Sequence, residues 1–290
     1  MSESIQFLIS GLTIGAVYAL VALGFTLIYN ASDVVNFAQG EFVMLGGMVT
    51  VFAAAAGFSL PVAALIAIIV TIVVGLLLYW CAIAPARGAS AVTLIIITIG
   101  ASIFLRGLAQ VMFDKQFHKL PSFSGDAPVN VLGAALQPQS LWVLGGTAFI
   151  VVVLYIFLEL TVVGKAVRAT AANRLAARLV GINTATVMML AFGGSAAIGA
   201  AAGILVTPIT LTSYDAGTML ALKGFAAAML GGIGNPLGAV AGGLLLGLLE
   251  SFGAGYVSST YKDGFAFIVI LVVLFAVPQG LFGRRSVERV

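Results

Sequence analysis

The sequence has little charge. Only 8% of its 290 residues are Asp, Glu, Lys or Arg, whereas 61% are hydrophobic. An ordinary soluble domain carries about 25% charged residues. The mean hydropathy of +1.18 is correspondingly high. A chain with so few charges cannot cover a soluble fold of this size with polar side chains, so the composition predicts a polytopic membrane protein.

Cysteine and histidine are almost absent. Cys81 and His118 are the single residues of their types, which excludes an internal disulfide and a His/Cys metal cluster, so we expect no metal site. No HExxH motif is present, which excludes a membrane zinc protease. Tyr214-Asp215 resembles half of an intramembrane aspartyl protease site, but its GxGD partner is missing. We therefore interpret Asp215 as an outer-surface turn residue and predict no catalytic residues.

A nucleotide-binding motif is also missing. Gly164-Lys165 has neither a glycine five residues before Gly164 nor a following Ser or Thr, so the phosphate-binding loop of ATPases is absent. We expect this chain neither to hydrolyse ATP alone nor to hold a cofactor. The net charge of +3 comes from clustered basic loops and does not indicate nucleic acid.

Long apolar runs account for most of the chain. Each run of about 20 residues can cross the hydrocarbon core as a helix. The region 216–252 contains a Gly-rich break at 231–236, which favours two short helices over one. We expect a single all-α transmembrane domain over 1–290, a bundle with broken and short helices and about nine membrane segments. The segments are 5–29, 41–57, 60–82, 91–113, 140–160, 187–206, two short helices within 216–252, and 264–281.

The distribution of Lys and Arg predicts the orientation of these segments. No Lys or Arg precedes Arg87, so the first apolar run lacks the basic start of a signal peptide and is read as a retained span. Basic loops remain on the cytoplasmic side. Arg87, the segment 164–183 and the tail arginines Arg284, Arg285 and Arg289 should therefore be cytoplasmic. Counting crossings places the N-terminus and the polar loop 114–139 outside, and the C-terminus in the cytoplasm.

The segment 164–183 is basic and contains no acidic residue. If it forms one helix, an apolar stripe lies on one face and Arg174 and Arg178 lie on the opposite face. The stripe consists of Ala172, Leu175, Ala176 and Leu179. Gly181 should end the helix, because glycine readily adopts the left-handed conformation of helix ends. The alternative is a basic loop that only sets the orientation.

A polar cluster interrupts the apolar pattern near residue 40. Asn36, Gln39 and Glu41 lie between apolar runs, and a carboxylate at membrane depth costs roughly 2.5–3.5 kcal/mol. We predict that the three residues line a translocation pathway, with Asn235 in the second Gly-rich break as a further candidate. Alternatively, Glu41 begins a helix and complements its dipole. Glu250 is predicted to lie at the membrane interface.

Three stretches together resemble one protein family. They are GKAVRATAANRLAARLVGIN at 164–183, NFAQGEFVMLGG at 36–47 and LKGFAAAMLGGIGNPLGAVAGGLLLGLLE at 222–250. The chain is similar to the membrane-spanning permease subunits of ABC importers for branched-chain amino acids. The resemblance implies a bacterial inner-membrane location and a cytoplasmic coupling segment at 164–183. The implied ATPase-coupling residues are Arg168, Arg174, Leu175, Arg178, Leu179 and Gly181.

The resemblance also implies partners. These are a second homologous permease subunit, two cytoplasmic ATPase subunits that bind the ATP, and an extracytoplasmic substrate-binding protein. Membrane lipid is a further expected partner of the chain. Urea or small aromatic acids are alternative substrates within the family. A different class, an ion-coupled secondary transporter, would need acidic residues near the midplane. Only Glu41 and Glu250 are candidates for that role, and the amphipathic segment would be unexplained.

Overall fold

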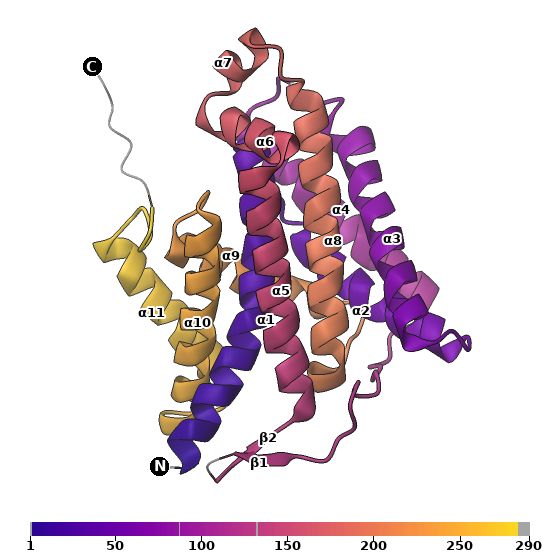
Figure 1. Cartoon of the computed structure of the whole chain (residues 1–290), viewed down its shortest axis with the longest axis vertical. Helices are drawn as coiled ribbons and strands as arrows, with labels where there is room; N and C mark the ends of the chain where they lie inside the picture. Colours follow the sequence, from indigo (N-terminus) through magenta and orange to yellow (C-terminus); the bar gives the residue numbers. More distant parts are fainter. Residues whose placement is uncertain (1, 87, 132, 284–290) are drawn as a thin grey trace.

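The computed structural model describes residues 2–86, 88–131 and 133–283 of the chain. They form a helical bundle with a small hairpin at one end (Figure 1). The helices are α1 Ser2–Ser32, α2 Gln39–Ala55, α3 Leu60–Leu78 with its continuation η1 Tyr79–Ile83, α4 Ala91–Phe113, α5 Pro138–Leu160, α6 Val162–Ala172, α7 Arg174–Leu179, α8 Thr184–Thr210, α9 Ala216–Gly231, α10 Pro236–Tyr256 and α11 Lys262–Ala276.

Six of these helices are long and apolar enough to cross a membrane. They are α1, α3 with η1, α4, α5, α8 and α10. The apolar helices α2 and α9 are shorter, with 17 and 16 residues, and α11 has 15 residues. The expected helical membrane bundle is therefore confirmed, and the count of nine membrane segments stays a prediction.

α1 lies in the centre of the bundle. Residues 19–22 of this helix are fully buried, and α1 packs against α5, α8, α9 and α10. The contact between α1 and α10 is very close at Gly15 and Gly247. A Cβ added to Gly247 would lie 2.3 Å from Cα of Gly15. Small residues at such a crossing let two helix backbones touch without the hydrophobic effect that drives packing in water.

α4 differs from α1 in its exposure. Only three of its residues, Thr98, Leu105 and Ala109, are buried, and apolar side chains such as Ile96 and Ile103 are 63% and 58% exposed. An apolar helix that leaves most of its surface uncovered is typical of a face that contacts lipid or another subunit. α1 therefore forms the interior of this bundle, and α4 forms part of its perimeter.

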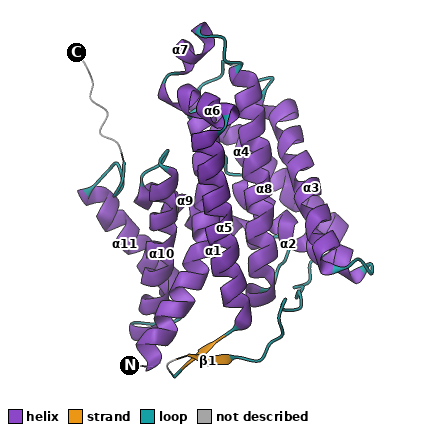
Figure 2. Ribbon diagram, viewed as in Figure 1, coloured by secondary structure: helices purple, strands orange, loops and turns teal. Residues whose placement is uncertain are grey.

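The loop 114–139 contains the one feature that the all-α prediction missed. Strands β1 (Val129–Val131) and β2 (Ala134–Leu136) pair antiparallel and are drawn in orange in Figure 2. The same loop forms an isolated bridge between His118 and Thr212, the residue two positions after α8. The described structure is therefore nearly all-α, and three-residue strands carry too little periodicity to be recognised in the sequence.

The two ends of the bundle have different contents. In Figure 1 the start of α1 and the β1–β2 hairpin lie at the lower end, and α6 and α7 lie at the upper end. The expected break after α9 is confirmed, since α9 ends at Gly231 and α10 begins at Pro236. The predictions for Arg87, Arg284, Arg285 and Arg289 fall outside the described residues.

Candidate functional site

The sequence-predicted polar cluster at the start of α2 is fully buried. Asn36, Gln39 and Glu41 each have a relative exposure of 0%. Asn36 shapes the turn that precedes the helix, because its Oδ1 accepts a hydrogen bond from the backbone N–H of Ala38 at 3.1 Å. Its Nδ2 is buried without a hydrogen-bond partner. One side of the Asn36 amide is thus used by the fold, and the other side is left open.

Gln39 joins three helices at one point. Its Nε2 donates to the backbone carbonyl of Ser195 on α8 at 3.3 Å, and its Oε1 accepts a hydrogen bond from the Ser195 hydroxyl. The Ser195 hydroxyl also lies 2.9 Å from the carbonyl of Gly24 on α1. Gln39 fits there because position 24 is glycine; a Cβ at that position would lie 2.0 Å from Nε2. The amide of Gln39 is therefore satisfied.

Glu41 has one partnered and one unpartnered oxygen. Its Oε1 accepts from the Ser102 hydroxyl of α4 at 2.8 Å, and its Oε2 is buried with no hydrogen bond. Glu41 also lies in the first turn of α2, where its charge complements the helix dipole. The two interpretations made from the sequence are thus compatible. The open oxygen is a site where a cationic or hydrogen-bond-donating group would be stabilised.

The N-termini of the short helices α2 and α9 meet beside Glu41. A Cβ added to Gly217 of α9 would lie 2.5 Å from the carbonyl oxygen of Gly40 and 2.9 Å from Oε2 of Glu41. Only glycine at both positions lets the backbones approach so closely. Two helix N-termini carry partial positive charge toward the same region. Arg106 of α4 reaches this junction as well, donating to the Thr218 hydroxyl of α9 at 2.8 Å.

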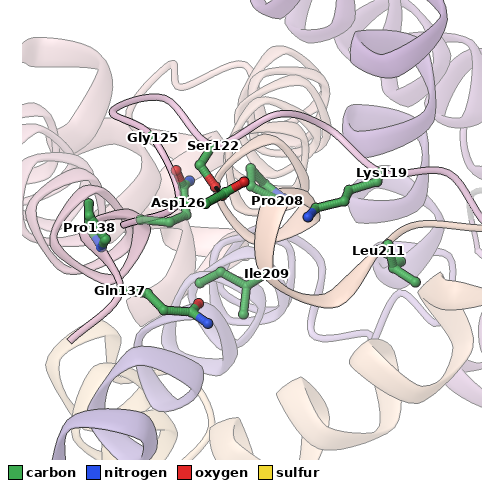
Figure 3. A pocket seen from close by; sticks show the side chains of 10 residues that line it. Lys119, Ser122, Gly125, Asp126, Gln137, Pro138, Pro208, Ile209 and Leu211 are labelled. Carbon is green, nitrogen blue, oxygen red and sulfur yellow. Dashed lines mark hydrogen bonds between the residues drawn. The ribbon is translucent and has the colours of Figure 1, made fainter. Parts of the chain in front are cut away.

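Two cavities lie around the end of α8. One, of about 170 Å³, lies between α2, α8 and α9, and Met44, Thr207 and Ala216 are among its lining residues. A larger one, of about 360 Å³, lies under the loop 114–137 and against the end of α8 (Figure 3). There the Ser122 hydroxyl donates to Asp126. Leu211 lines both cavities.

A second buried polar cluster lies between α1, α9 and α10. Lys223 Nζ is 2.8 Å from Oε1 of Glu250, and the Tyr18 hydroxyl donates to Oε2 at 2.7 Å. Lys223 Nζ is also 3.1 Å from the Tyr18 hydroxyl. Glu250 has a relative exposure of 4%. Lys223 thus supplies a charge partner for Glu250 inside the bundle, and the placement of Glu250 at the membrane interface stays a prediction.

Sequence reasoning missed Lys223. It is an isolated lysine in an otherwise apolar short helix, and a lysine at membrane depth almost always has an acidic partner. That signal was available, but the partner Glu250 lies 27 residues away and could not be assigned from spacing.

Asn235 has a local role: its Oδ1 accepts from the N–H groups of Leu237 and Gly238 and caps α10. Its Nδ2 donates to the carbonyl of Phe282.

The basic segment forms two helices, which corrects the prediction of one. α6 ends at Ala172 and α7 begins at Arg174. Asn173 separates them with an extended backbone, and its Oδ1 accepts from the Ala176 N–H at 2.9 Å. Asparagine at an N-cap competes with helix continuation in this way. The predicted stripe is thus divided, with Ala172 on α6 and the other three residues on α7.

The end of α7 is as predicted. Gly181 has φ of +88°, and its N–H donates to the carbonyl of Arg178. The following Ile182 N–H donates to the carbonyl of Ala177. This pair of bonds closes a helix end, and glycine adopts the left-handed conformation without a steric penalty.

α7 presents leucines outward and arginines toward its own chain. Leu175 and Leu179 have relative exposures of 69% and 82%. Arg178 Nε donates to the Thr184 hydroxyl at 3.0 Å, and Arg174 Nη2 lies 2.7 Å from the Met188 sulfur, both on α8. The expected opposition of the two faces is confirmed. Both arginines contact α8 in this structure, and the coupling role expected for them stays a prediction.

Arg168 is the remaining basic residue of the segment that was predicted to have a coupling role. Arg168 forms an ion pair with Glu159 at the end of α5, which holds α6 against the bundle. Among the described residues, no group of three or more His, Cys, Asp or Glu side chains is placed to hold a metal ion.

The comparisons with known proteins point to one family. Residues 7–274 match the family described as "Branched-chain amino acid transport system / permease component". The chain is 35% identical to the high-affinity branched-chain amino acid transport system permease protein LivH of Escherichia coli K12, over 99% of this chain and 97% of that protein. It is 34% identical to the corresponding protein BraD of Pseudomonas aeruginosa, over 99% and 98%. The autoinducer 2 import system permease protein LsrC of Yersinia pseudotuberculosis is 28% identical, over 80% of this chain and 65% of that protein.

Proposed function

Because this chain belongs to the family of branched-chain amino acid transport system permease components, we propose that it carries branched-chain amino acids inward through the membrane at the expense of ATP. It is a multi-pass protein of the bacterial inner membrane. In the proposed importer it pairs with a second homologous permease subunit, two cytoplasmic ATPase subunits and an extracytoplasmic substrate-binding protein.

The need for separate ATPases follows from what the sequence lacks. No phosphate-binding loop is present anywhere in the 290 residues, so the energy for transport must come from another subunit or from an ion gradient. An ATPase partner needs a surface on which to act. The exposed leucines of α7 offer an apolar contact surface, which is the observation that carries the proposal.

We place the coupling contact on Leu175 and Leu179. Two large apolar side chains exposed on a short helix are costly in water and become stabilising when a partner covers them. Arg168, Arg174 and Gly181 support this contact from behind: Arg168 anchors α6 to Glu159, Arg174 contacts α8, and Gly181 ends α7. Arg178 does the same through Thr184. Movement of the ATPases would then shift α6, α7 and the attached α8 together.

This role requires the upper end of the bundle in Figure 1 to be cytoplasmic. The basic residues of α6 and α7 favour this orientation. The start of α1 and the loop 114–139 then face outward, where the substrate-binding protein would deliver its cargo. With α2, α9 and α11 counted as membrane segments, the chain has nine, and its C-terminus is cytoplasmic.

We propose that Asn36, Gln39 and Glu41 lie beside the translocation pathway. The open oxygen of Glu41 and the open amide of Asn36 are available to the ammonium or carboxylate of a zwitterionic amino acid. The converging N-termini of α2 and α9 add partial positive charge, an arrangement by which broken helices in transporters hold substrate groups. Asn235 stabilises the second broken pair from the cytoplasmic side, through its cap on α10.

The alternative is an ion-coupled secondary transporter. It would require an acidic residue that binds the ion, and Glu250 is already neutralised by Lys223. Glu41 is the remaining candidate. Within the family, permeases for urea or small aromatic acids are alternatives, since the name of LsrC shows that similar proteins serve other solutes.

Reconstitution distinguishes these possibilities. The chain is purified with the subunits encoded by its neighbouring genes and placed in proteoliposomes with the binding protein. We expect uptake of leucine, isoleucine or valine that does not require an ion gradient. This uptake should require ATP on the side of the membrane that the ATPase subunits face. Uptake by this chain alone, driven by a proton or sodium gradient, would replace the proposal with the secondary transporter. ATP-driven uptake of urea or an aromatic acid in place of these amino acids would change the substrate only.

A further inference from the structure

A cavity of about 400 Å³ lies behind α7, on the side opposite the exposed leucines. It is bounded by the end of α1, by η1, by the start of α4, and by the facing sides of α7 and α8. We call it the α7 cavity. Its charged lining residues among those described are Arg174, Arg178 and Asp33.

The two guanidinium groups of the α7 cavity have no anionic partner among the described residues. Arg174 Nε is buried without a hydrogen bond, and its Nη2 contacts only the sulfur of Met188, a weak acceptor. Arg178 has a neutral hydroxyl partner, Thr184. By contrast, Arg168 on the adjacent helix pairs with Glu159. Arg174 is partly buried, and leaving it without a strong acceptor is costly. Asp33 supplies one negative charge in the lining against two guanidinium charges, so the cavity keeps a net positive charge suited to an anion.

Apart from Ser32 and Asp33, the rest of the described lining is apolar or glycine. Ile83, Leu94 and Val34 form part of its wall. The cavity also adjoins the start of α4, where Val92 and Ile96 are 65% and 63% exposed. This combination of two cations, a largely apolar wall and an adjoining helix with an uncovered apolar face matches one kind of ligand better than a free anion. A phospholipid brings both a phosphate and acyl chains to the membrane boundary.

We propose that the α7 cavity binds the phosphate group of an anionic phospholipid from the cytoplasmic leaflet. The inference rests on the proposed orientation, in which α7 faces the cytoplasm. Phosphate oxygens can accept several charge-assisted hydrogen bonds from two guanidinium groups at once. Basic pockets between membrane helices on the cytoplasmic side bind anionic headgroups in this way. The bound lipid would hold α7 in position and present its leucines to the ATPase.

The test measures lipid binding by the full chain in a neutral detergent. Thermal unfolding is followed as phosphatidylglycerol, phosphatidylcholine or inorganic phosphate is added. We expect phosphatidylglycerol to raise the unfolding temperature of the wild type, whereas phosphatidylcholine and inorganic phosphate leave it nearly unchanged. The double variant Arg174→Gln with Arg178→Gln should bind phosphatidylglycerol more weakly by on the order of tenfold or more. Arg168→Gln loses the same kind of charge outside the cavity and should bind as the wild type does.

A second variant covers the case in which the double variant fails to fold. Ala89 lines the cavity and is exposed, so Ala89→Phe should obstruct the cavity while leaving both arginines and the packed core in place. We expect the same loss of phosphatidylglycerol binding. An equal shift in the wild type and in Ala89→Phe overturns the proposal, as does an equal response to phosphatidylcholine. A shift produced fully by inorganic phosphate identifies a free-anion site and overturns the lipid assignment.

The result is separate from the proposed transport function. The assay uses neither ATPase nor substrate, so a failure to bind lipid leaves the assignment of Leu175 and Leu179 as coupling residues standing. Failure of ATP-driven uptake, in turn, would not change the measured lipid affinity.

Discussion

Two polar clusters are buried in the same apolar bundle, and they differ in how completely they are satisfied. In the cluster of Tyr18, Lys223 and Glu250, opposite charges meet at 2.8 Å and both carboxylate oxygens have partners. In the cluster of Asn36, Gln39 and Glu41, one amide nitrogen and one carboxylate oxygen have none. We call the first the closed cluster and the second the open cluster.

The two clusters are expected to have different roles, one in stabilising the fold and the other in transport. Burying a charge is tolerable when it is paired and hydrogen-bonded, and costly when it is not. The closed cluster meets this condition within the chain and ties α1, α9 and α10 together. The open cluster does not, so a group from outside the described chain, either substrate or a moving segment, is the natural partner. Substitutions in the closed cluster should therefore lower stability, whereas substitutions in the open cluster should lower transport.

The largest expected effect is on stability, from Lys223→Met. This change leaves the buried Glu250 without its closest cation, and breaking a buried ion pair from one side costs about 3–5 kcal/mol. We expect a marked fall in unfolding temperature in detergent and in yield. Lys262→Met is the matched control, because Lys262 Nζ lies 3.9 Å from the same carboxylate with its side chain 46% exposed; its effect should be about 1 kcal/mol or less.

A double variant of Lys223 and Glu250 tests whether the unpaired charge causes the loss of stability. Lys223→Met combined with Glu250→Leu removes both charges and should recover most of the stability lost in the single variant. A single Lys223→Met variant that is as stable as the wild type would show that the closed cluster does not support the fold.

The second prediction concerns Glu41→Gln in the open cluster. Gln keeps an oxygen that can accept from Ser102, and the unpartnered Oε2 has no hydrogen bond to lose. Unfolding temperature should change little, whereas ATP-driven uptake should fall on the order of tenfold or more, the size expected for losing a contact to a charged group. Glu3→Gln, an exposed carboxylate at the start of α1, is the control. Normal uptake by Glu41→Gln would leave the residue with only its role at the start of α2.

The smallest expected effect is that of Ser195→Ala. The change removes the hydroxyl that donates to Gln39 and leaves Oε1 of that residue without its donor. Gln39 Nε2 keeps its bond to the backbone carbonyl of residue 195, so we expect a loss of about 1 kcal/mol in unfolding free energy. A loss as large as that of Lys223→Met would mean that the open cluster is also a structural device, and the contrast between the clusters would fail.

Much of the fold could be predicted because a long apolar run crosses a membrane as an α-helix. The expected span 91–113 coincides with α4, and the break at 231–236 coincides with the turn between α9 and α10. The polar break at Asn36, Gln39 and Glu41 could be predicted, since polar residues between apolar runs indicate an interruption inside the bundle. Their partners Ser102, Ser195 and Gly217 could not, because those contacts are made by helices distant in the sequence.

The features that could not be predicted depend on side-chain contacts. The pairing of Glu250 could not be predicted, because the lysine that neutralises it is on another helix. The division of the basic segment at Asn173 depends on one side-chain cap, which competes with a helical pattern that otherwise continues. The direction of Arg174 and Arg178 depends on where α8 supplies Met188 and Thr184. Tertiary partners decided the first and third cases, and a local cap decided the second.

The most direct test of the account concerns α7, on which the ATP-driven function rests. The chain is purified together with its partner subunits as Leu175→Asp, and as Phe117→Asp for comparison. Phe117 is 73% exposed in the loop at the opposite end, so it controls for an apolar-to-charge change on the surface. Because Leu175→Asp places a charge in an apolar contact, we predict that the ATPase no longer copurifies and that ATP-driven uptake is lost, whereas Phe117→Asp retains the ATPase. Copurification and normal uptake with Leu175→Asp would contradict the assignment of α7 as the coupling helix.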